Sequence, residues 1–224
     1  MPNNIVVEAT GRHRAEQKTY RIPLTPKRYD SAVLGPALTL AAYLLGSISF
    51  GLLFARRQGV DLRGVGSGNI GATNVGRALG KSTGRKVMLL DILKGFVPVA
   101  LARWAFDLPW PWITAVGIAA TLGHIFPIWH AFRGGKGAAT AVGVLLAALP
   151  PIGFATLLTF ALVKKFSGRA SVASLSAATL AAALTIGLDG RQWPIQLAVG
   201  LWIIVVLRHA ENIARLLQGE EPLG

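Results

Sequence analysis

The sequence predicts an all-α, polytopic membrane protein with seven transmembrane helices joined by short loops. Hydrophobic residues make up 52% of the 224-residue chain, the mean hydropathy is +0.50 and 15% of residues are charged, whereas soluble domains are about 25% charged. Most apolar runs reach the roughly 20 residues that a helix needs to cross a bilayer. They lack the alternation of barrel strands, so helices are the expected spanning elements.

The apolar residues form segments separated by polar loops, and one segment contains a proline pair. The segments cover about residues 33–55, 87–106, 110–131, 139–163, 172–188 and 193–207. Pro150 and Pro151 lie in the middle of 139–163, where proline removes a helical hydrogen bond and clashes with the preceding turn. We therefore expect two short helices in that segment, which brings the number of crossings to seven.

The basic residues favour seven crossings over six. With seven, the basic residues of 56–86, 133–136, 164–169 and the tail after Leu207 share one face, and only Arg191 remains in the opposite loops. The positive-inside rule places the shared face and the carboxyl terminus in the cytoplasm. Residues 1–30 disagree with this arrangement, because the extension would lie outside although it contains Arg12, Arg14, Lys18, Arg21, Lys27 and Arg28. We divide the chain into this polar basic extension, 1–30, and one membrane domain, 31–224.

Charge and composition also limit the partners. A formal net charge of +13 would suggest nucleic acid for a soluble chain, but here the basic residues lie between apolar spans, where they favour anionic lipid. We expect contacts with membrane lipids and none with nucleic acid. The chain has no cysteine and its four histidines are scattered, so we expect no disulfide, thiolate chemistry or metal site.

Residues 66–77, GSGNIGATNVGR, form the most informative polar segment. Gly66 and Gly68 let the backbone approach a ligand closely, and consecutive amides can then cradle phosphate oxygens. Side-chain donors come from Ser67, Asn69, Thr73, Asn74 and Arg77. This composition favours an anion site over a simple tight turn.

A second polar cluster, FRGGKGAAT at 132–140, places Lys136 among glycines just before a predicted helix. A cation beside free helix-terminal amides again suits an anion, although an interfacial lysine that sets topology is the alternative. The segment is not a Walker A loop, because Gly137 follows Lys136 where that motif has Ser or Thr.

A third cluster, RHAENIARLLQGEE at 208–221, is expected to continue the last membrane helix. Arg208, Asn212 and Arg215 would then share one helical stripe, with His209 beside it. Glu211 could pair with Arg215 four residues later. Within the spans, Asp91 and Lys94 are either a mutually neutralising pair or part of a functional site, and His124 is either a core histidine or a ligand.

In this order, the motifs resemble the bacterial acyl-phosphate:glycerol-3-phosphate acyltransferases of the PlsY type. The resemblance covers about residues 40–221 and rests on GSISFG (46–51), GSGNIGATNVGRALG (66–80), DILKG (91–95), GHIFPIW (123–129), GGKGAAT (134–140) and RHAENIARLLQGEE. Ser49 stands where the family usually has proline, and Ala210 where a second arginine is common. The resemblance implies a multi-pass enzyme of the bacterial inner membrane that needs no cofactor. Its implied reaction, early in phospholipid biosynthesis, moves a fatty acyl group from acyl phosphate to the 1-hydroxyl of glycerol 3-phosphate, giving lysophosphatidate and phosphate.

Residue chemistry and this resemblance together assign roles. The amides of 66–69 are expected to bind the donor phosphoryl group. The expected catalytic set is Ser67, Asn69, Arg77, Lys136, His209, Glu211 and Asn212. The expected substrate-binding set is Gly66, Gly68, Thr73, Asn74, Lys94, His124, Gly134, Gly135, Gly137, Thr140, Arg208 and Arg215. Acyl phosphate carries a good leaving group, so alignment of the two substrates supplies much of the rate without an enzyme nucleophile.

Three candidates for the general base stay open, namely His209, Glu211 and a phosphate dianion of the substrate. The alternative function is a transporter or channel for a phosphorylated solute. A transporter is expected to show internal repeats and binding groups at the bilayer midplane, whereas here no repeat is evident and the polar clusters share one face. The sequence therefore favours an interfacial enzyme, which we expect to be a monomer.

Overall fold

The computed structural model describes residues 4–10, 17–23 and 29–223, and the chain divides into two compact units, Met1–Asp30 and Ser31–Gly224. The first unit holds a hairpin in which β1 (Asn4–Thr10) pairs antiparallel with β2 (Gln17–Pro23), with Val7 opposite Tyr20. β-branched and aromatic residues in both segments explain the strands. The hairpin is a departure from the all-α class that the sequence predicts. Arg12, Arg14, Lys27 and Arg28 lie outside the described residues.

The second unit is helical. Its α-helices are α1 (Ser31–Gly46), α2 (Phe50–Arg57), α3 (Ala72–Leu79), α4 (Lys81–Ala100), α5 (Trp110–Ile125), α6 (Ala138–Ala148), α7 (Pro150–Ser167), α8 (Ala170–Leu184), α9 (Gln192–Arg208) and α10 (Ala210–Leu217). Short 3₁₀ turns cover Leu62–Gly64 and Ile128–His130, and π turns at Leu101–Ala105 and Thr185–Asp189 extend α4 and α8.

The proline pair separates α6 from α7, which confirms the predicted break. Leu149 leaves helical geometry at φ −139° and ψ 71°, and both prolines occupy the first turn of α7. Proline is tolerated there because the first amides of a helix have no partner within it. The two helices pack on each other.

The break between α1 and α2 forms without proline at position 49. α1 ends at Gly46 and α2 begins at Phe50. The Ser47 hydroxyl donates to the carbonyl oxygen of Tyr43 at 2.9 Å, and both Ser47 and Ser49 are buried. Two buried serines therefore accompany the break, and one of them, Ser47, bonds to the preceding turn.

Several segments suit a membrane. Within the described residues, Ser31–Arg57, Trp110–His130 and Ala170–Asp189 are long and apolar enough to span one, and α9 with α10 forms a fourth span if the bent pair is counted as one. α4 carries Asp91 and Lys94, and α7 ends near Lys164 and Lys165. These charges lower the hydropathy of both helices.

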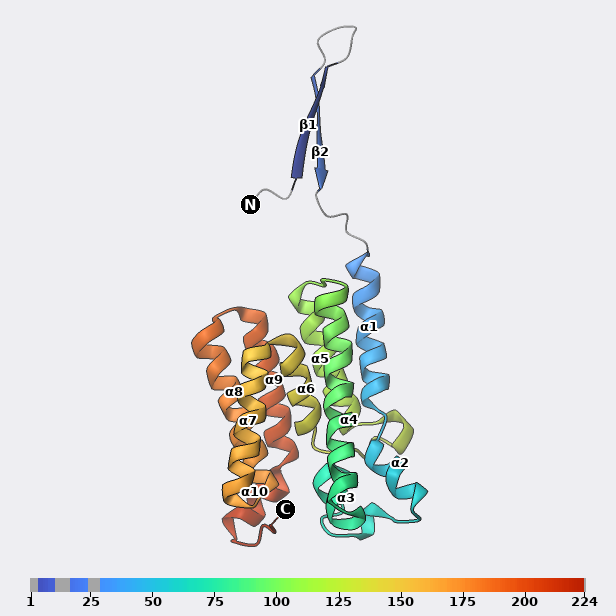
Figure 1. The fold of residues 1–224 in the computed structure, drawn as a ribbon, viewed down its shortest axis with the longest axis vertical. Helices are drawn as coiled ribbons and strands as arrows, with labels where there is room; N and C mark the ends of the chain where they lie inside the picture. Colours follow the sequence, from blue (N-terminus) through green and yellow to red (C-terminus); the bar gives the residue numbers. More distant parts are fainter. Residues whose placement is uncertain (1–3, 11–16, 24–28, 224) are drawn as a thin grey trace. The chain divides into compact units, whose positions relative to one another are not determined.

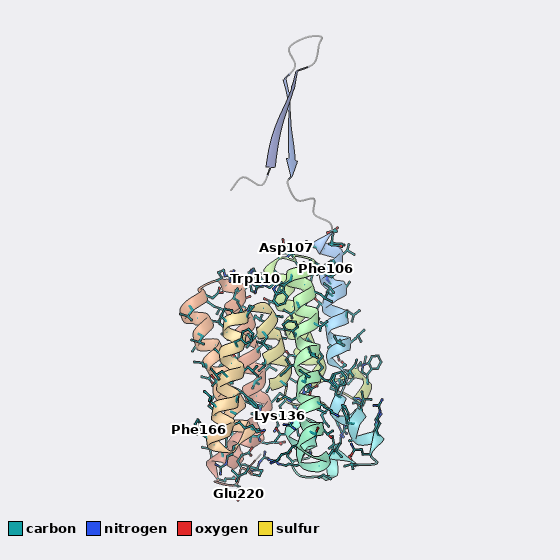
Figure 2. All side chains as sticks on the ribbon, in the orientation of Figure 1. Phe106, Asp107, Trp110, Lys136, Phe166 and Glu220 are labelled. Atoms are coloured by element: carbon teal, nitrogen blue, oxygen red, sulfur yellow. The ribbon has the colours of Figure 1, made fainter. Side chains whose placement is uncertain are left out.

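Close backbone contacts place α6 at the centre of this unit, where it packs on both α4 and α7 (Figure 1). A Cβ atom at Gly95 would overlap the carbonyl oxygen of Thr140, and one at Gly143 would overlap that of Ile92. Glycine therefore lets α4 and α6 approach closely. Figure 2 shows Asp107 and Trp110 at one end of the helical unit and Glu220 at the other, with Lys136 toward the end that holds Glu220.

Candidate active site

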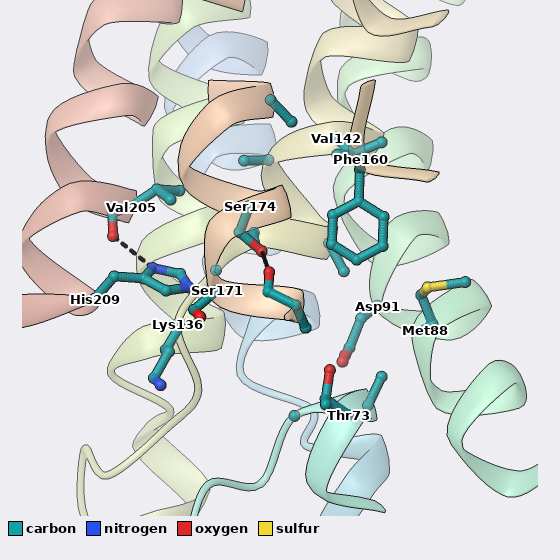
Figure 3. A pocket seen from close by; sticks show the side chains of 18 of the residues that line it. Thr73, Met88, Asp91, Lys136, Val142, Phe160, Ser171, Ser174, Val205 and His209 are labelled. Carbon is teal, nitrogen blue, oxygen red and sulfur yellow. Dashed lines mark hydrogen bonds between the residues drawn. The ribbon is translucent and has the colours of Figure 1, made fainter. Parts of the chain in front are cut away.

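A cavity of about 630 Å³ brings the three polar clusters together. Its polar lining includes Ser67, Asn69, Thr73, Asn74, Arg77, Lys136, His209, Asn212 and Arg215. Its apolar lining comes from α4 and from α6 to α9 and includes Met88, Ile92, Val142, Leu145, Leu157, Phe160, Ala181 and Leu201. Figure 3 shows Val142 and Phe160 on one side of the cavity and Thr73 and Lys136 on the other. The cavity can thus hold a molecule with an anionic head and an apolar chain.

Lys136 connects the second cluster to the third. Its Nζ donates to Oδ1 of Asn212, and Nδ2 of Asn212 donates to Oε1 of Glu221 at 2.6 Å. Burial lowers the pKa of Lys136, and the positive charge of Arg215 lowers it further. A lysine held so close to a second cation is well placed to be neutralised by a bound anion.

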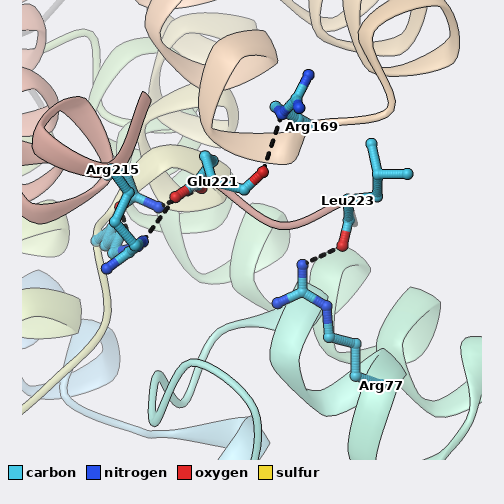
Figure 4. Close-up of polar contacts among 7 residues, drawn as sticks. Arg77, Arg169, Arg215, Glu221 and Leu223 are labelled. Atoms are coloured by element: carbon cyan, nitrogen blue, oxygen red, sulfur yellow. Dashed lines mark hydrogen bonds and ion pairs between the residues drawn. The ribbon is translucent and has the colours of Figure 1, made fainter. Parts of the chain in front are cut away.

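Glu221 is a cavity residue for which the sequence pattern predicts no role. Its carboxylate oxygen Oε2 accepts from Nε of Arg215 at 2.8 Å, and its backbone oxygen accepts from Nε of Arg169 at 3.0 Å (Figure 4). Burial raises the pKa of Glu221, but hydrogen bonds from groups including Asn212 and Arg215 outweigh burial and hold it below its usual range. The carboxyl-terminal tail therefore lies over the cationic part of the cavity.

The same tail reaches Arg77 on α3. Nη2 of Arg77 donates to the carbonyl oxygen of Leu223 at 2.5 Å (Figure 4). The side chain is exposed and also lines the cavity. Arg77 can consequently exchange this backbone contact for a phosphate oxygen.

The glycine-rich loop has a backbone that favours glycine, and two of its amides bond within the loop. Gly66 and Gly68 have φ values of +58° and +67°, a region that favours glycine. The Ser67 amide donates to Oδ1 of Asn74 at 3.1 Å, and the Gly68 amide donates to the carbonyl oxygen of Val65 at 3.1 Å. These two amides hold the loop together instead of pointing free into the cavity.

Asn74 organises this loop from within. It is 2% exposed, and its Nδ2 donates to the carbonyl oxygens of Leu62 and Val65 at 3.1 and 2.9 Å. With the bond from the Ser67 amide to its Oδ1, Asn74 uses both side-chain hydrogens and one acceptor position to bond to the loop and the residues before it. Its place in the lining is therefore a consequence of supporting Ser67 and its neighbours.

The second glycine cluster packs on the end of α5. The amides of Gly134 and Gly135 donate to the carbonyl oxygens of Ile125 and His124 at 3.0 and 3.1 Å. Gly134, Gly135 and Thr140 do not line the cavity, whereas Gly137, with φ +83° at the start of α6, does. Lys136 is thus presented by a loop whose glycines fit against a helix end.

The predicted continuation of the last membrane helix is wrong. α9 and α10 meet at an angle of 59°, so Arg208 leaves the stripe of Asn212 and Arg215. Nη2 of Arg208 donates to the carbonyl oxygen of Gly135 at 3.4 Å, and the residue does not line the cavity. Nor does Glu211, which is exposed, and Arg215 pairs with Glu221 instead of Glu211.

His209 lies at this bend, directly after α9 ends at Arg208. Its Nδ1 is 2.8 Å from the carbonyl oxygen of Val205, and a carbonyl can only accept, so Nδ1 carries the hydrogen and Nε2 keeps a free lone pair. Burial lowers the pKa of His209 to about 4. A neutral imidazole with one free acceptor is a candidate proton acceptor.

Other lining residues gave no sequence signal. Ser171 and Ser174 of α8 are buried and line the cavity (Figure 3), but within ASVASLS they are indistinguishable from small residues that pack helices.

Asp91 and His124, which the sequence singles out, line the cavity as well, whereas Lys94 does not. Among the described residues, no group of three or more His, Asp or Glu side chains could hold a metal ion.

A family model described as glycerol-3-phosphate acyltransferase matches residues 36–219. The chain belongs to this family. A glycerol-3-phosphate acyltransferase of Thioalkalivibrio sulfidiphilus is 47% identical over 191 residues, which cover 85% of this chain and 94% of that protein. The Aquifex aeolicus protein of the same description is 44% identical, covering 82% and 96%. These matches confirm the resemblance seen in the motifs.

A solved structure of the family has the same fold. The crystal structure of PlsY (YgiH), an integral membrane glycerol 3-phosphate acyltransferase in its glycerol 3-phosphate form, superposes with a TM-score of 0.82 at 41% identity, covering 85% of this chain and 96% of that one. Its lysophosphatidic acid form gives a TM-score of 0.79 at 40% identity. The chain is therefore a helical integral membrane protein.

Proposed function

We propose that this chain transfers a fatty acyl group from acyl phosphate to the 1-hydroxyl of glycerol 3-phosphate, giving lysophosphatidate and inorganic phosphate. The observation that carries the proposal is the single cavity in which cations and apolar helix faces meet. The acceptor is small and anionic, whereas donor and product each join a phosphate to an acyl chain. The relatives are described as glycerol-3-phosphate acyltransferases, and the solved structures are described as glycerol 3-phosphate and lysophosphatidic acid forms.

The reaction is an acyl substitution. The bond between the acyl carbon and the phosphate oxygen breaks as the 1-hydroxyl oxygen bonds to that carbon, and the hydroxyl proton passes to a base. Two phosphoryl groups must lie close together for this geometry, and they repel. Arg77, Lys136 and Arg215 line one cavity, so their charges oppose the repulsion and align the substrates.

His209 is the protein base in this proposal, because its Nε2 accepts no hydrogen bond from the part of the chain that the structure describes and the residue lines the cavity. Binding of two phosphate anions beside the ring would raise the pKa of His209 from about 4, which makes it a better base when both substrates are present. Glu211 is left out because it is exposed and does not line the cavity.

The proposed topology has seven crossings, formed by α1 and by α4 to α9. It places the site, the basic loops and the carboxyl terminus in the cytoplasm of a bacterial cell, with 31–224 as the catalytic domain in the inner membrane. The separation of α6 from α7 supports an odd number of crossings. The cytoplasmic face then holds the basic residues Arg63, Arg77, Lys136 and Arg215. We propose a monomer without a cofactor.

The test uses purified protein in detergent with acyl phosphate and glycerol 3-phosphate. Lysophosphatidate and phosphate should appear in equal amounts, and neither acyl-CoA nor acyl carrier protein should replace the acyl phosphate. Formation of lysophosphatidate only from a thioester donor would refute the donor assignment. Uptake of a phosphorylated solute into sealed vesicles without any acyl transfer would refute the assignment as an enzyme.

A further inference from the structure

Three titratable side chains form a buried cluster beside the cavity, which we define as Asp91, Lys94 and His124. Their exposed fractions are 3%, 3% and 6%. Nζ of Lys94 is 2.8 Å from Oδ1 of Asp91, and Nδ1 of His124 is 3.6 Å from the same oxygen. Burying charged groups within a membrane span costs free energy, so this buried cluster indicates a function.

On one side, the cluster fixes the joint between α1 and α2. Nζ of Lys94 also donates to the carbonyl oxygen of Ile48 at 2.8 Å, and it lies 5.7 Å from the centre of the Phe50 ring. Ile48 is in the break between the two helices. Since α2 leads through residues 58–65 to the glycine-rich loop, Lys94 anchors the start of the segment that carries this loop.

On the other side, the cluster fixes the loop that presents Lys136. The carbonyl oxygen of His124 accepts from the amide of Gly135 at 3.1 Å. The His124 ring packs so closely on Gly135 that a Cβ atom there would overlap Nε2. Nε2 is therefore covered by the loop, and the ring is placed to support Lys136 instead of exchanging protons with a substrate.

We propose that Asp91, Lys94 and His124 are positioning residues, which hold the glycine-rich loop and the Lys136 loop in register across the cavity. The Asp91 carboxylate lies between the two arms, 2.8 Å from Nζ of Lys94 and 3.6 Å from Nδ1 of His124, and in Figure 3 it points toward Thr73 at the cavity wall. The alternative is a pair that only neutralises its own charge. The kinetic part of this proposal rests on the acyl transfer proposed above.

The first test is the double variant Asp91→Asn/Lys94→Met. Removing both charges avoids the strong destabilisation that one unpaired buried charge would cause. We expect kcat to fall about 10- to 100-fold, with KM for glycerol 3-phosphate changed less than about threefold, since the phosphate-binding groups remain but are displaced. The matched control is Asp189→Asn/Arg191→Met, which removes an ion pair of 2.7 Å outside the cavity lining. Wild-type kcat in a folded Asp91/Lys94 variant would overturn the proposal.

A pair of single variants at His124 tests the positioning role if the double variant does not fold. Asparagine places Nδ2 where histidine has Nδ1, so His124→Asn keeps a donor toward Asp91, whereas His124→Leu does not. We expect His124→Asn to retain at least about fivefold more kcat than His124→Leu. Equal kcat values in the two would overturn the proposal.

Hydrogen exchange separates this proposal from the proposed reaction. The Gly134 and Gly135 amides should exchange faster in His124→Leu than in His124→Asn. Equal exchange in the two variants would overturn the positioning role, whatever the activity. A wild-type protein that makes no lysophosphatidate from acyl phosphate would refute the proposed function and leave the exchange result to decide the network.

Discussion

Replacing Glu221 with glutamine should loosen the carboxyl-terminal tail, because one carboxylate there joins two donors. Nδ2 of Asn212 lies 2.6 Å from Oε1, and Nε of Arg215 lies 2.8 Å from Oε2. The Glu221 side chain is 6% exposed and that of Arg215 is 32% exposed. Glutamine keeps one acceptor oxygen, but its NH₂ group faces the second donor.

The free energy of unfolding should fall by about 2 kcal/mol in Glu221→Gln. A hydrogen bond to a buried charged group contributes about 1.5–3 kcal/mol, and exposure of Arg215 puts its ion pair at the lower end of that range. For a domain of this size, about 2 kcal/mol corresponds to a fall of about 4–8 °C in the melting temperature. Thermal unfolding of the purified protein in detergent measures it.

The effect should depend on pH. Because hydrogen bonds hold the pKa of Glu221 below its ordinary value of 4.5, its stabilisation is fully present above about pH 4.5 and is lost as the pH falls through the lower value of the folded state. The difference between wild type and Glu221→Gln should therefore shrink below that pH. Glu220→Gln, at the exposed neighbouring residue, is the control. Equal melting temperatures for the two variants at pH 7 would refute the reasoning.

Three further predictions concern catalysis and packing. Lys136→Met should lower kcat/KM about 10²- to 10³-fold while the protein still inserts, as expected for loss of a cation at developing charge; wild-type turnover would contradict this. Since the pKa of His209 is about 4 in the protein without substrates, the ratio of wild-type to His209→Gln kcat/KM values, which reports the free enzyme, should stay constant from pH 7 to 5 and fall near pH 4, and a fall near pH 6.5 would contradict it. Gly143→Ala should destabilise the protein, because the new Cβ would overlap the Ile92 carbonyl oxygen, whereas Gly187→Ala, with no atom within 4 Å, should not; equal melting temperatures would show that α4 and α6 can separate.

The sequence predicts those features that local chemistry determines. Pro150 and Pro151 break the fourth apolar segment because proline cannot continue a helix from its interior. Lys136 and Arg77 belong to segments too polar for a lipid-facing position, and both line one cavity. Glycine at 66 and 68 indicates a backbone that other residues rarely adopt.

The remaining features depend on tertiary contacts that have no local signal. The stripe of Arg208 and Asn212 assumes a straight helix, and a bend at His209 removes Arg208 from it. Glu221 follows a glycine turn in a short tail, and only the fold shows that its carboxylate reaches Arg215. The strands at 4–10 and 17–23 alternate too weakly to be separated from a polar extension by pattern alone.

A structure with glycerol 3-phosphate and a stable phosphonate analogue of acyl phosphate tests the central claim most directly. We expect both phosphoryl groups within hydrogen-bond distance of cations that line the cavity, Arg77 and Lys136 among them, with the acyl chain along Val142 and Phe160. An acyl chain on the outer surface of the helices, or a phosphate bound away from Lys136, would contradict it.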